Sequence, residues 1–126
     1  MQDRPDLVEL LESVKHFLET EVLPALPDAR LRFRARVAAN VLSVAARERM
    51  LEAELLAVER LRLSNLLSNG EATVEELNLE LARRIRSAEI EATPGSAVWK
   101  HLRETAVDKL RIANPAYLKR IGEHGA

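Results

Sequence analysis

The longest regular pattern in this sequence runs from Ala29 to Leu67, a stretch that contains neither Gly nor Pro. Hydrophobic side chains recur there in steps of three and four, which is the spacing of one helical face. Only Asn40 and Glu48 interrupt that face, and Asp28 is suited to cap a helix that starts after it. The pattern predicts a long helical segment with a buried face of Phe33, Val37, Asn40, Val41, Val44, Leu51, Leu55 and Val58.

The length of this central segment conflicts with a compact shape. At a rise of about 1.5 Å per residue, some forty helical residues form a rod of roughly 60 Å. A compact chain of 126 residues has a diameter of only roughly 36 Å. We therefore expect the segment to bend or break within residues 48–54, although Glu and Ala in that stretch favour a helix.

A first helix precedes the central segment. Asp3 and Pro5 indicate its start, and Pro24 and Pro27 end it after about Leu23. Hydrophobic residues again recur in steps of three and four. The predicted buried stripe consists of Leu7, Leu10, Leu11, Val14, Phe17 and Leu18.

Two further helices follow the central segment, which stops at residues 68–70 with Gly70 as the expected cap. The first begins with the capping-box pattern of Thr73 and Glu76, and its inner face is Val74, Leu77, Leu81, Ile85 and Ala88. The second begins near Thr93–Pro94, ends at Asn114–Pro115, and is expected to bury Trp99, Leu102, Ala106, Leu110 and Ala113. Since no stretch alternates with period two, the pattern predicts an all-α, single-domain bundle of about five helices over residues 1–126.

Composition and charge agree with this fold class and narrow the function. Hydrophobic residues make up 47% of the chain but aromatic residues only 3%, so Leu, Val, Ile and Ala must build the core. The net charge of −1 gives no general attraction to nucleic acid or to anionic membranes, and we expect neither as a partner. The sequence has no cysteine, no signal-peptide pattern and no membrane-length apolar run, so a cytoplasmic location is the default.

The second half of the central segment suggests a subunit interface. Between Leu51 and Leu67 the apolar residues lie almost all round the helix, so no clear polar side remains for solvent. A helix of this kind is buried on several sides or covered by a second copy. We predict a homodimer whose interface includes Leu55, Leu56, Leu63 and Leu67.

Three polar residues lie closest to the main apolar stripe: Arg36, Asn40 and Glu48. One interpretation is a structural network, with Arg36 paired to Glu21 and Asn40 bound to a backbone group. The other is a binding site for an anion or an acyl-carrier ligand, because an arginine can hold a carboxylate or phosphate through two hydrogen bonds. The two interpretations differ in whether these residues face a cavity.

Other candidate chemistry is weak. His101, Glu104 and Asp108 lie within two turns of one helix, but their spacing matches no common metal-binding motif. The chain has no nucleophile motif of the form GxSxG and no glycine-rich phosphate loop. We expect no catalytic residues, no metal and no cofactor. The arginines at the start of the central segment divide between two opposite sides of the helix, which disfavours a basic strip: Arg30, Arg32, Arg34 and Arg36.

Several runs resemble a small bacterial family of helical domains of unknown function. They are LRFRARVAANVL from Leu31, RERMLEAELLAVERLRLSNLL from Arg47, HLRETAVDKL from His101 and KLRIANPAYL from Lys109. Members of that family are often encoded beside an acyl-CoA dehydrogenase-like protein and an aminoglycoside-phosphotransferase-like protein. The family often carries Gly-Pro where this chain has Glu52-Ala53.

These observations predict a non-catalytic helical accessory or interaction protein. The resemblance implies an association with acyl-CoA metabolism, with an acyl-CoA dehydrogenase-like or phosphotransferase-like protein as a partner. The alternative is a small-molecule binding protein for a CoA-type or phosphorylated ligand, with its pocket near Arg36 and Asn40.

Overall fold

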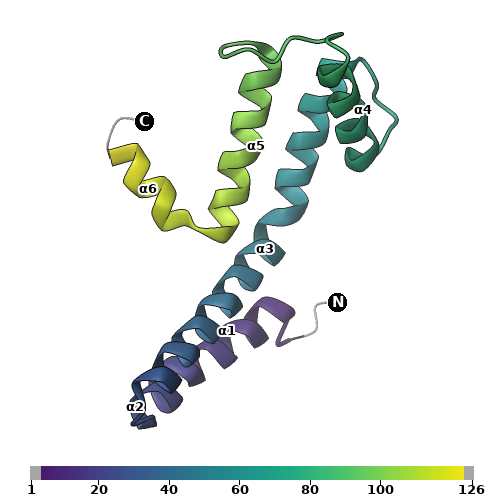
Figure 1. Cartoon of the computed structure of the whole chain (residues 1–126). Coiled ribbons are helices and arrows are strands. Elements are labelled where there is room, and N and C mark those ends of the chain that lie inside the picture. The colour runs from purple at the N-terminus through teal and green to yellow at the C-terminus, as the bar shows by residue number, and fades with distance from the viewer. Residues whose placement is uncertain (1–3, 124–126) are drawn as a thin grey trace. The chain divides into compact units, whose positions relative to one another are not determined.

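The computed structural model describes residues 4–123, and every regular element in that range is a helix (Figure 1). The all-α fold is therefore confirmed. The first three elements follow one another without a gap and form one helical stretch. With this stretch counted once, residues 4–123 contain five helical stretches, the expected number. The elements are α1 (Leu7–Phe17), the π-helical segment η1 (Leu18–Val22), α2 (Leu23–Ala25), α3 (Ala29–Leu67), α4 (Val74–Arg86), α5 (Ala97–Ala113) and α6 (Pro115–Glu123).

The chain divides into two compact units on either side of the bond between Glu52 and Ala53. Helix α3 nevertheless runs without interruption through this point, so the predicted break within residues 48–54 is wrong. A break would be needed only if the chain folded into one compact body, whereas each of the two units packs on its own part of α3. With neither Gly nor Pro there, local propensity keeps the helix intact. That the chain acts as a single domain stays a prediction.

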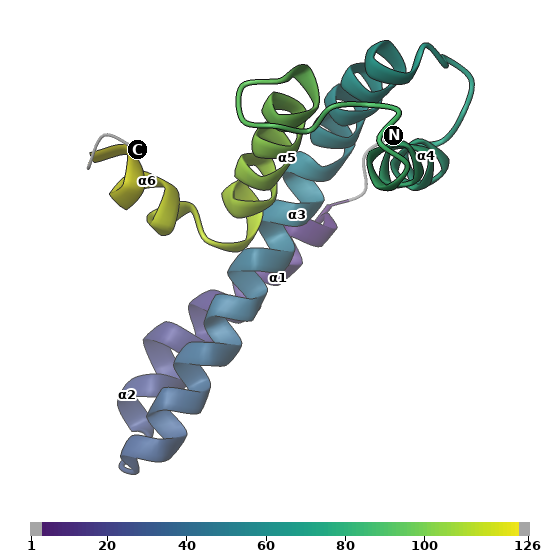
Figure 2. The same ribbon diagram turned by 45° about the horizontal axis from the view of Figure 1, so that its top comes forward.

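In the first unit, α1 lies beside the first half of α3 in both ribbon views (Figures 1 and 2). Asp6 and Glu9 form a capping box at the start of α1, whereas the predicted cap Asp3 lies outside the described residues. Asp28 caps α3 as expected, because its carboxylate accepts a hydrogen bond of 2.9 Å from the Arg30 amide. Arg32 fixes the preceding turn by donating to the carbonyls of Leu26 and Pro27 at 2.9 and 2.8 Å.

The two helices of the first unit meet on sides other than the predicted ones. The partly buried residues are Val8, Glu9, Leu11 and Lys15 of α1 and Leu18 at the start of η1, while Leu7, Leu10, Val14 and Phe17 are about half exposed. On the first half of α3 the most buried residues are Ala39 and Ala46, and Phe33, Val37 and Val41 are exposed. Small side chains let the helix axes approach closely, so the alanine side of α3 forms the contact. The two predicted buried stripes are therefore wrong at these seven positions, and also at Asn40 and Val58 of α3, which are exposed.

In the second unit, the end of α3 packs with α4 and the start of α5 around a leucine-rich core. Its fully or nearly fully buried members are Leu63, Leu67, Leu77, Leu81 and Val98. The inner face of α4 and the Thr73–Glu76 capping box are confirmed, except that Ala88 is exposed. Leu63 and Leu67 pack inside the chain, so of the four residues predicted at a dimer interface only Leu55 and Leu56 retain accessible surface.

Helix α5 starts and faces differently from the prediction. Its cap is Ser96, three residues after Thr93, and the side chain of Ser96 accepts from the Trp99 amide at 3.2 Å. Val98 and His101 are the buried residues. Of the residues that were expected inside, Leu110 is partly buried, whereas Trp99, Leu102, Ala106 and Ala113 are exposed. The predicted end at Asn114 is confirmed, and α6 follows directly.

The ends of α3 and α4 both use a left-handed residue that is not glycine. Ser68 has φ 54° and Ala88 has φ 60°. In each case the next amide reaches back five residues, from Asn69 to the Ser64 carbonyl and from Glu89 to the Arg84 carbonyl. The predicted cap at Gly70 is thus displaced to Ser68.

Candidate functional site

An open groove of about 410 Å³ lies in the first unit, between the stretch from α1 to α2 and the first half of α3. It contains two of the three predicted ligand-binding residues, Arg36 and Asn40. Glu48 does not line the groove. It is exposed and lies eight residues after Asn40 on α3, which is roughly 12 Å along the helix axis. The lining residues are Lys15, Leu18, Glu19, Leu23, Ala35, Arg36, Ala39, Asn40 and Ser43.

One wall of the groove is shaped by η1. There the backbone bonds span five residues, as from the Leu23 amide to the Leu18 carbonyl, and the turn is wider than in an α-helix. The hydroxyl of Thr20 donates to the His16 carbonyl at 2.7 Å just before this turn. Short π-helical segments inside α-helices are frequent at functional sites. Here the segment contributes Leu18 and Glu19 to the wall.

The opposite wall is made of small and polar side chains of α3. Ala35 and Ala39 leave room, and Arg36 and Asn40 lie one turn apart on the same side. The Ser43 hydroxyl donates to the Ala39 carbonyl at 3.3 Å, so its oxygen lone pairs remain able to accept. This wall therefore offers a guanidinium, an amide and a hydroxyl oxygen side by side.

The charged groups of the groove are not used by the protein itself. Among residues 4–123, Lys15, Glu19 and Arg36 form no ion pair or hydrogen bond through their side chains. The pairing of Arg36 with Glu21 that the structural network required is absent, and Glu21 is exposed. The predicted network is thus wrong, and Arg36 and Asn40 instead line a cavity.

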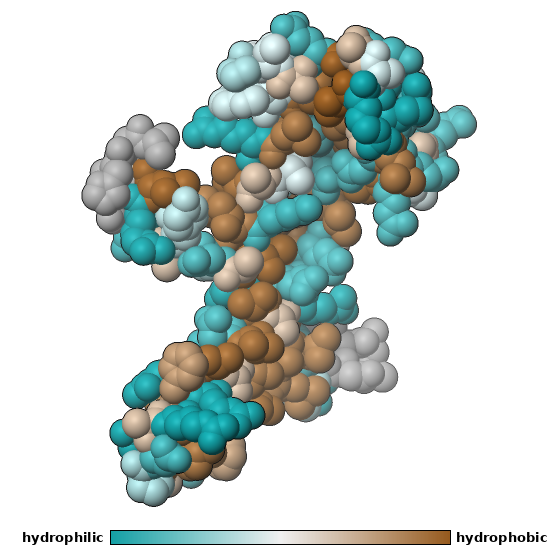
Figure 3. Space-filling model, viewed as in Figure 1, coloured by the Kyte–Doolittle hydropathy of each residue, from teal (hydrophilic) through white to brown (hydrophobic). Residues whose placement is uncertain are grey.

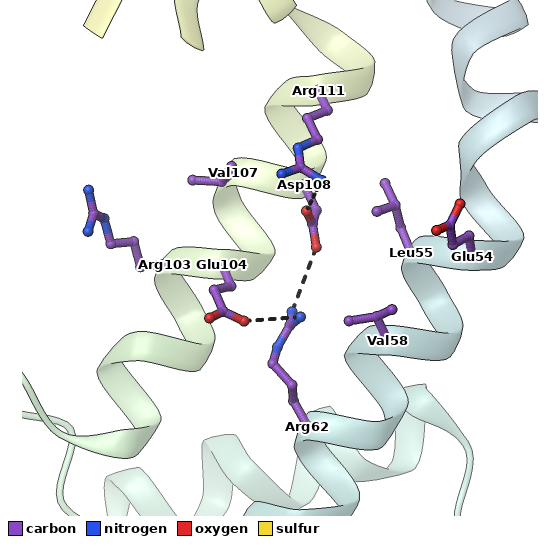
Figure 4. A pocket seen from close by; sticks show the side chains of 9 residues that line it. All are labelled: Glu54, Leu55, Val58, Arg62, Arg103, Glu104, Val107, Asp108 and Arg111. Carbon is purple, nitrogen blue, oxygen red and sulfur yellow. Dashed lines mark ion pairs between the residues drawn. The ribbon is translucent and has the colours of Figure 1, made fainter. Parts of the chain in front are cut away.

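A second polar cluster joins α3 to α5 in the second unit (Figure 4). Its centre is Arg62, which donates through Nε to Nδ1 of His101 at 3.1 Å and through Nη2 to the Thr105 hydroxyl at 3.0 Å. Nη1 lies 3.3 Å from the Glu104 carboxylate, and Asp108 lies 3.9 Å from Nη2. The side chain of Arg62 is only 18% exposed, so these contacts form away from most of the solvent.

The cluster fixes the protonation state of His101. This side chain is 3% exposed, and its Nδ1 accepts the hydrogen bond from Arg62, so the proton of the neutral ring is on Nε2. Burial lowers the pKa of His101, and the charge of Arg62 lowers it further. Nε2 has no hydrogen-bond partner within the described part of the chain.

The acidic residues noted on this helix are also engaged with arginines. Asp108 lies between Arg62 and Arg111, whose Nη1 is 3.3 Å from it, and Glu104 points to Arg62 in Figure 4. Three arginines and three carboxylates line the adjacent open cavity, so their charges balance. Among the described residues no group of His, Asp and Glu is arranged to hold a metal ion. The cluster is a structural tie between two helices.

Four functional residues were not predicted from the sequence: Lys15, Glu19, Ser43 and Arg62. For Lys15 a signal existed, since it follows Leu11 by four residues and precedes Leu18 by three, the spacing of the inward side of α1. Arg62 lies between Leu61 and Leu63, and the apolar pattern of that stretch gave no sign that this residue has a polar role. Glu19 and Ser43 carry no local signal.

Fold and site together define an all-α protein with a polar groove between two helices. The chain matches the family described as Domain of unknown function (DUF6285) over residues 24–117, and it belongs to this family. No curated protein and no solved structure matches it. The match begins after η1, so α1 and part of the groove wall lie before the matched segment. Within residues 4–123 no helix has the length and apolar character needed to cross a membrane.

Proposed function

We propose that the protein is a non-catalytic helical interaction module whose binding surface is the apolar face of α1. This face consists of Leu7, Leu10, Val14 and Phe17. The single observation that supports it is the exposure of these four large side chains, each about half accessible, at the three-four spacing of one helix side. Figure 3 shows apolar surface over part of the region formed by α1 and the first half of α3, with hydrophilic surface beside it.

A surface of this kind suits a partner that is itself helical. Exposed apolar residues in a row on one side of a helix are the usual element of helix-to-helix recognition. Helix α3 adds Phe33, Val37 and Val41, which are also exposed in the same unit. Covering such side chains removes apolar area from water, at about 25 cal/mol for each Å².

The proposed partner is a second copy of the chain, as expected from the sequence. The proposed interface is now the apolar face of α1, in place of the predicted one at Leu55, Leu56, Leu63 and Leu67. Light scattering over a range of concentrations tests this. We expect a dimer for the natural sequence and a shift toward monomer for Val14→Lys, because a buried lysine without a partner is costly. Leu79→Lys is the matched control, since Leu79 is 73% exposed on α4. A monomer at every concentration would remove the dimer.

The association with acyl-CoA metabolism is a proposal that rests on the family resemblance. Its test is purification from the native cell under mild conditions, followed by mass spectrometry. A stoichiometric complex with an acyl-CoA dehydrogenase-like or phosphotransferase-like protein would support it. Loss of that complex in Val14→Lys but not in Leu79→Lys would assign it to the apolar face of α1.

A second candidate function is the binding of a CoA-type or phosphorylated small molecule. It is favoured by one observation: Arg36 and Asn40 line a groove and have no partner for their side chains within residues 4–123. Thermal unfolding with acyl-CoAs and phosphorylated metabolites tests it. A ligand at 100 times its dissociation constant adds about 2.7 kcal/mol to the free energy of unfolding. Unchanged melting with all compounds would reject this function.

A further inference from the structure

We infer that the groove of the first unit binds a small molecule that carries one anionic group and at least one hydrogen-bond donor. The inference rests on the second candidate function and specifies its ligand. Lys15 and Arg36 supply the positive charges and Glu19 supplies the acceptor for the donor.

The two cations come from opposite walls. Lys15 belongs to α1 and Arg36 to α3, and both line the same groove without an ion pair among residues 4–123. Their mutual repulsion favours an anion between them. The planar guanidinium of Arg36 can hold two oxygens of a carboxylate or phosphate, while the ammonium of Lys15 acts as a compact point charge.

Glu19 makes the site selective. It lies one turn after Lys15 on the same wall, yet within the described chain it neutralises neither cation. A ligand that presents only anionic oxygens would meet its negative charge. A hydroxyl or amine on the ligand would instead donate to the Glu19 carboxylate, so the site favours an anion that also carries a donor.

The remaining lining residues and the volume of the groove limit the size and the chemical character of the ligand. Leu18, Leu23, Ala35 and Ala39 are apolar, and the volume of about 410 Å³ falls in the range of small-molecule sites. The Asn40 amide can both donate and accept beside Arg36. A short chain that carries the donor and ends in the anionic group fits this arrangement, whereas a macromolecular anion has no extended basic surface to follow.

The test is calorimetric titration at a constant ionic strength of roughly 0.15 M with three probes. Glycerol 3-phosphate carries a phosphate and hydroxyls, methyl phosphate lacks the hydroxyls, and glycerate carries a carboxylate and hydroxyls. We expect glycerol 3-phosphate to bind more tightly than methyl phosphate. Comparison with glycerate decides between phosphate and carboxylate as the anionic group.

Variants assign the binding to the groove. Arg36→Gln and Lys15→Gln should each weaken glycerol 3-phosphate binding about tenfold or more, the loss typical of a charged hydrogen bond. Arg34→Gln is the control, because it removes the same charge from an exposed residue that does not line the groove. Glu19→Gln should reduce the preference for glycerol 3-phosphate over methyl phosphate. Circular dichroism confirms that each variant is folded.

The outcomes separate this inference from the function on which it rests. Equal weakening by Arg36→Gln and Arg34→Gln would overturn the site, since only the general charge would then matter. If phosphorylated compounds bind but Lys15→Gln, Glu19→Gln and Arg36→Gln leave their affinities unchanged, small-molecule binding stands and the groove assignment fails. If neither the probes nor the phosphorylated compounds bind, both are rejected.

Discussion

Arg62 and His101 are 39 positions apart, yet the Nε of Arg62 donates to Nδ1 of His101 at 3.1 Å. The contact holds α3 and α5 together where apolar side chains would be expected to pack. It also leaves the imidazole neutral, because a protonated ring could not accept from a guanidinium. This pair therefore affects both the free energy of unfolding of the protein and the dependence of that free energy on pH.

Arg62→Ala should lower the free energy of unfolding by about 1–3 kcal/mol. The substitution leaves His101 and the Thr105 hydroxyl without their shared donor, and an unpaired buried polar group carries a cost of that size. Urea denaturation measures it. Arg103→Ala is the control, since Arg103 is exposed and lies over the Trp99 ring at 5.8 Å. Equal losses in the two variants would contradict a specific role for Arg62.

The pKa of His101 predicts that acid destabilises the protein. Its folded pKa lies below the ordinary value of 6.5, so the unfolded state binds more protons between the two values. The stabilisation is complete above pH 6.5 and is lost as the pH falls toward the folded pKa. The slope reaches at most about 1.4 kcal/mol per pH unit for one group.

Unfolding by urea between pH 5 and 8 measures this dependence. His101→Gln should flatten the slope in that window, because the titrating group is removed. His16→Gln should retain it, since His16 is exposed on α1. A slope that persists in His101→Gln would assign the acid sensitivity to other groups.

Ala88→Gly should stabilise the protein by about 0.5–1 kcal/mol. Ala88 has φ 60°, where the β-carbon of an L-residue is unfavourable and glycine has no such cost. Thermal unfolding reports the change. The same substitution at exposed Ala57, inside α3, should instead destabilise by about 1 kcal/mol. Destabilisation at both positions would show that Ala88 is not strained.

Asn40→Leu should change the free energy of unfolding by less than about 0.5 kcal/mol. The Asn40 side chain is exposed at the groove and has no hydrogen-bond partner among residues 4–123, so its loss leaves no buried group unpaired. Chemical denaturation measures this. A loss of 1–3 kcal/mol would indicate a structural contact instead.

The local signals of the sequence were enough for the fold class and for most helix ends. Capping at Asp28 and Thr73 and termination at Asn114 depend on neighbouring residues alone, and all three predictions are confirmed. The break predicted near Glu52 failed because it came from a global size argument rather than from a local signal.

The choice of buried face could not be made from periodicity. The predicted stripe of the first helix covered two adjacent sides, and only its members Leu11 and Leu18 are partly buried. In α5 the inward side is one position earlier than predicted, at Val98 and His101. Which of two adjacent sides turns inward depends on the facing helix, such as the alanines of α3 or the reach of Arg62. The periodicity of a single helix carries no information about the helix that faces it.

The candidate site was half predictable. Arg36 and Asn40 were found because they interrupt or border an apolar stripe, and such positions need a partner or a ligand. The opposite wall of the groove was not predicted, because nothing in the amino-acid sequence of Leu18–Val22 indicates a π-helical turn. The groove arises only when that turn meets α3.

The π turn also bears on which length changes the chain can accept. Since η1 accommodates one residue more than a regular helical turn, removal of a single residue between Leu18 and Val22 would yield an unbroken α-helix with both flanks still aligned. A deletion anywhere in α1 would rotate all preceding side chains by about 100° against α3. We therefore expect η1 to tolerate the deletion of one residue, whereas α1 should not.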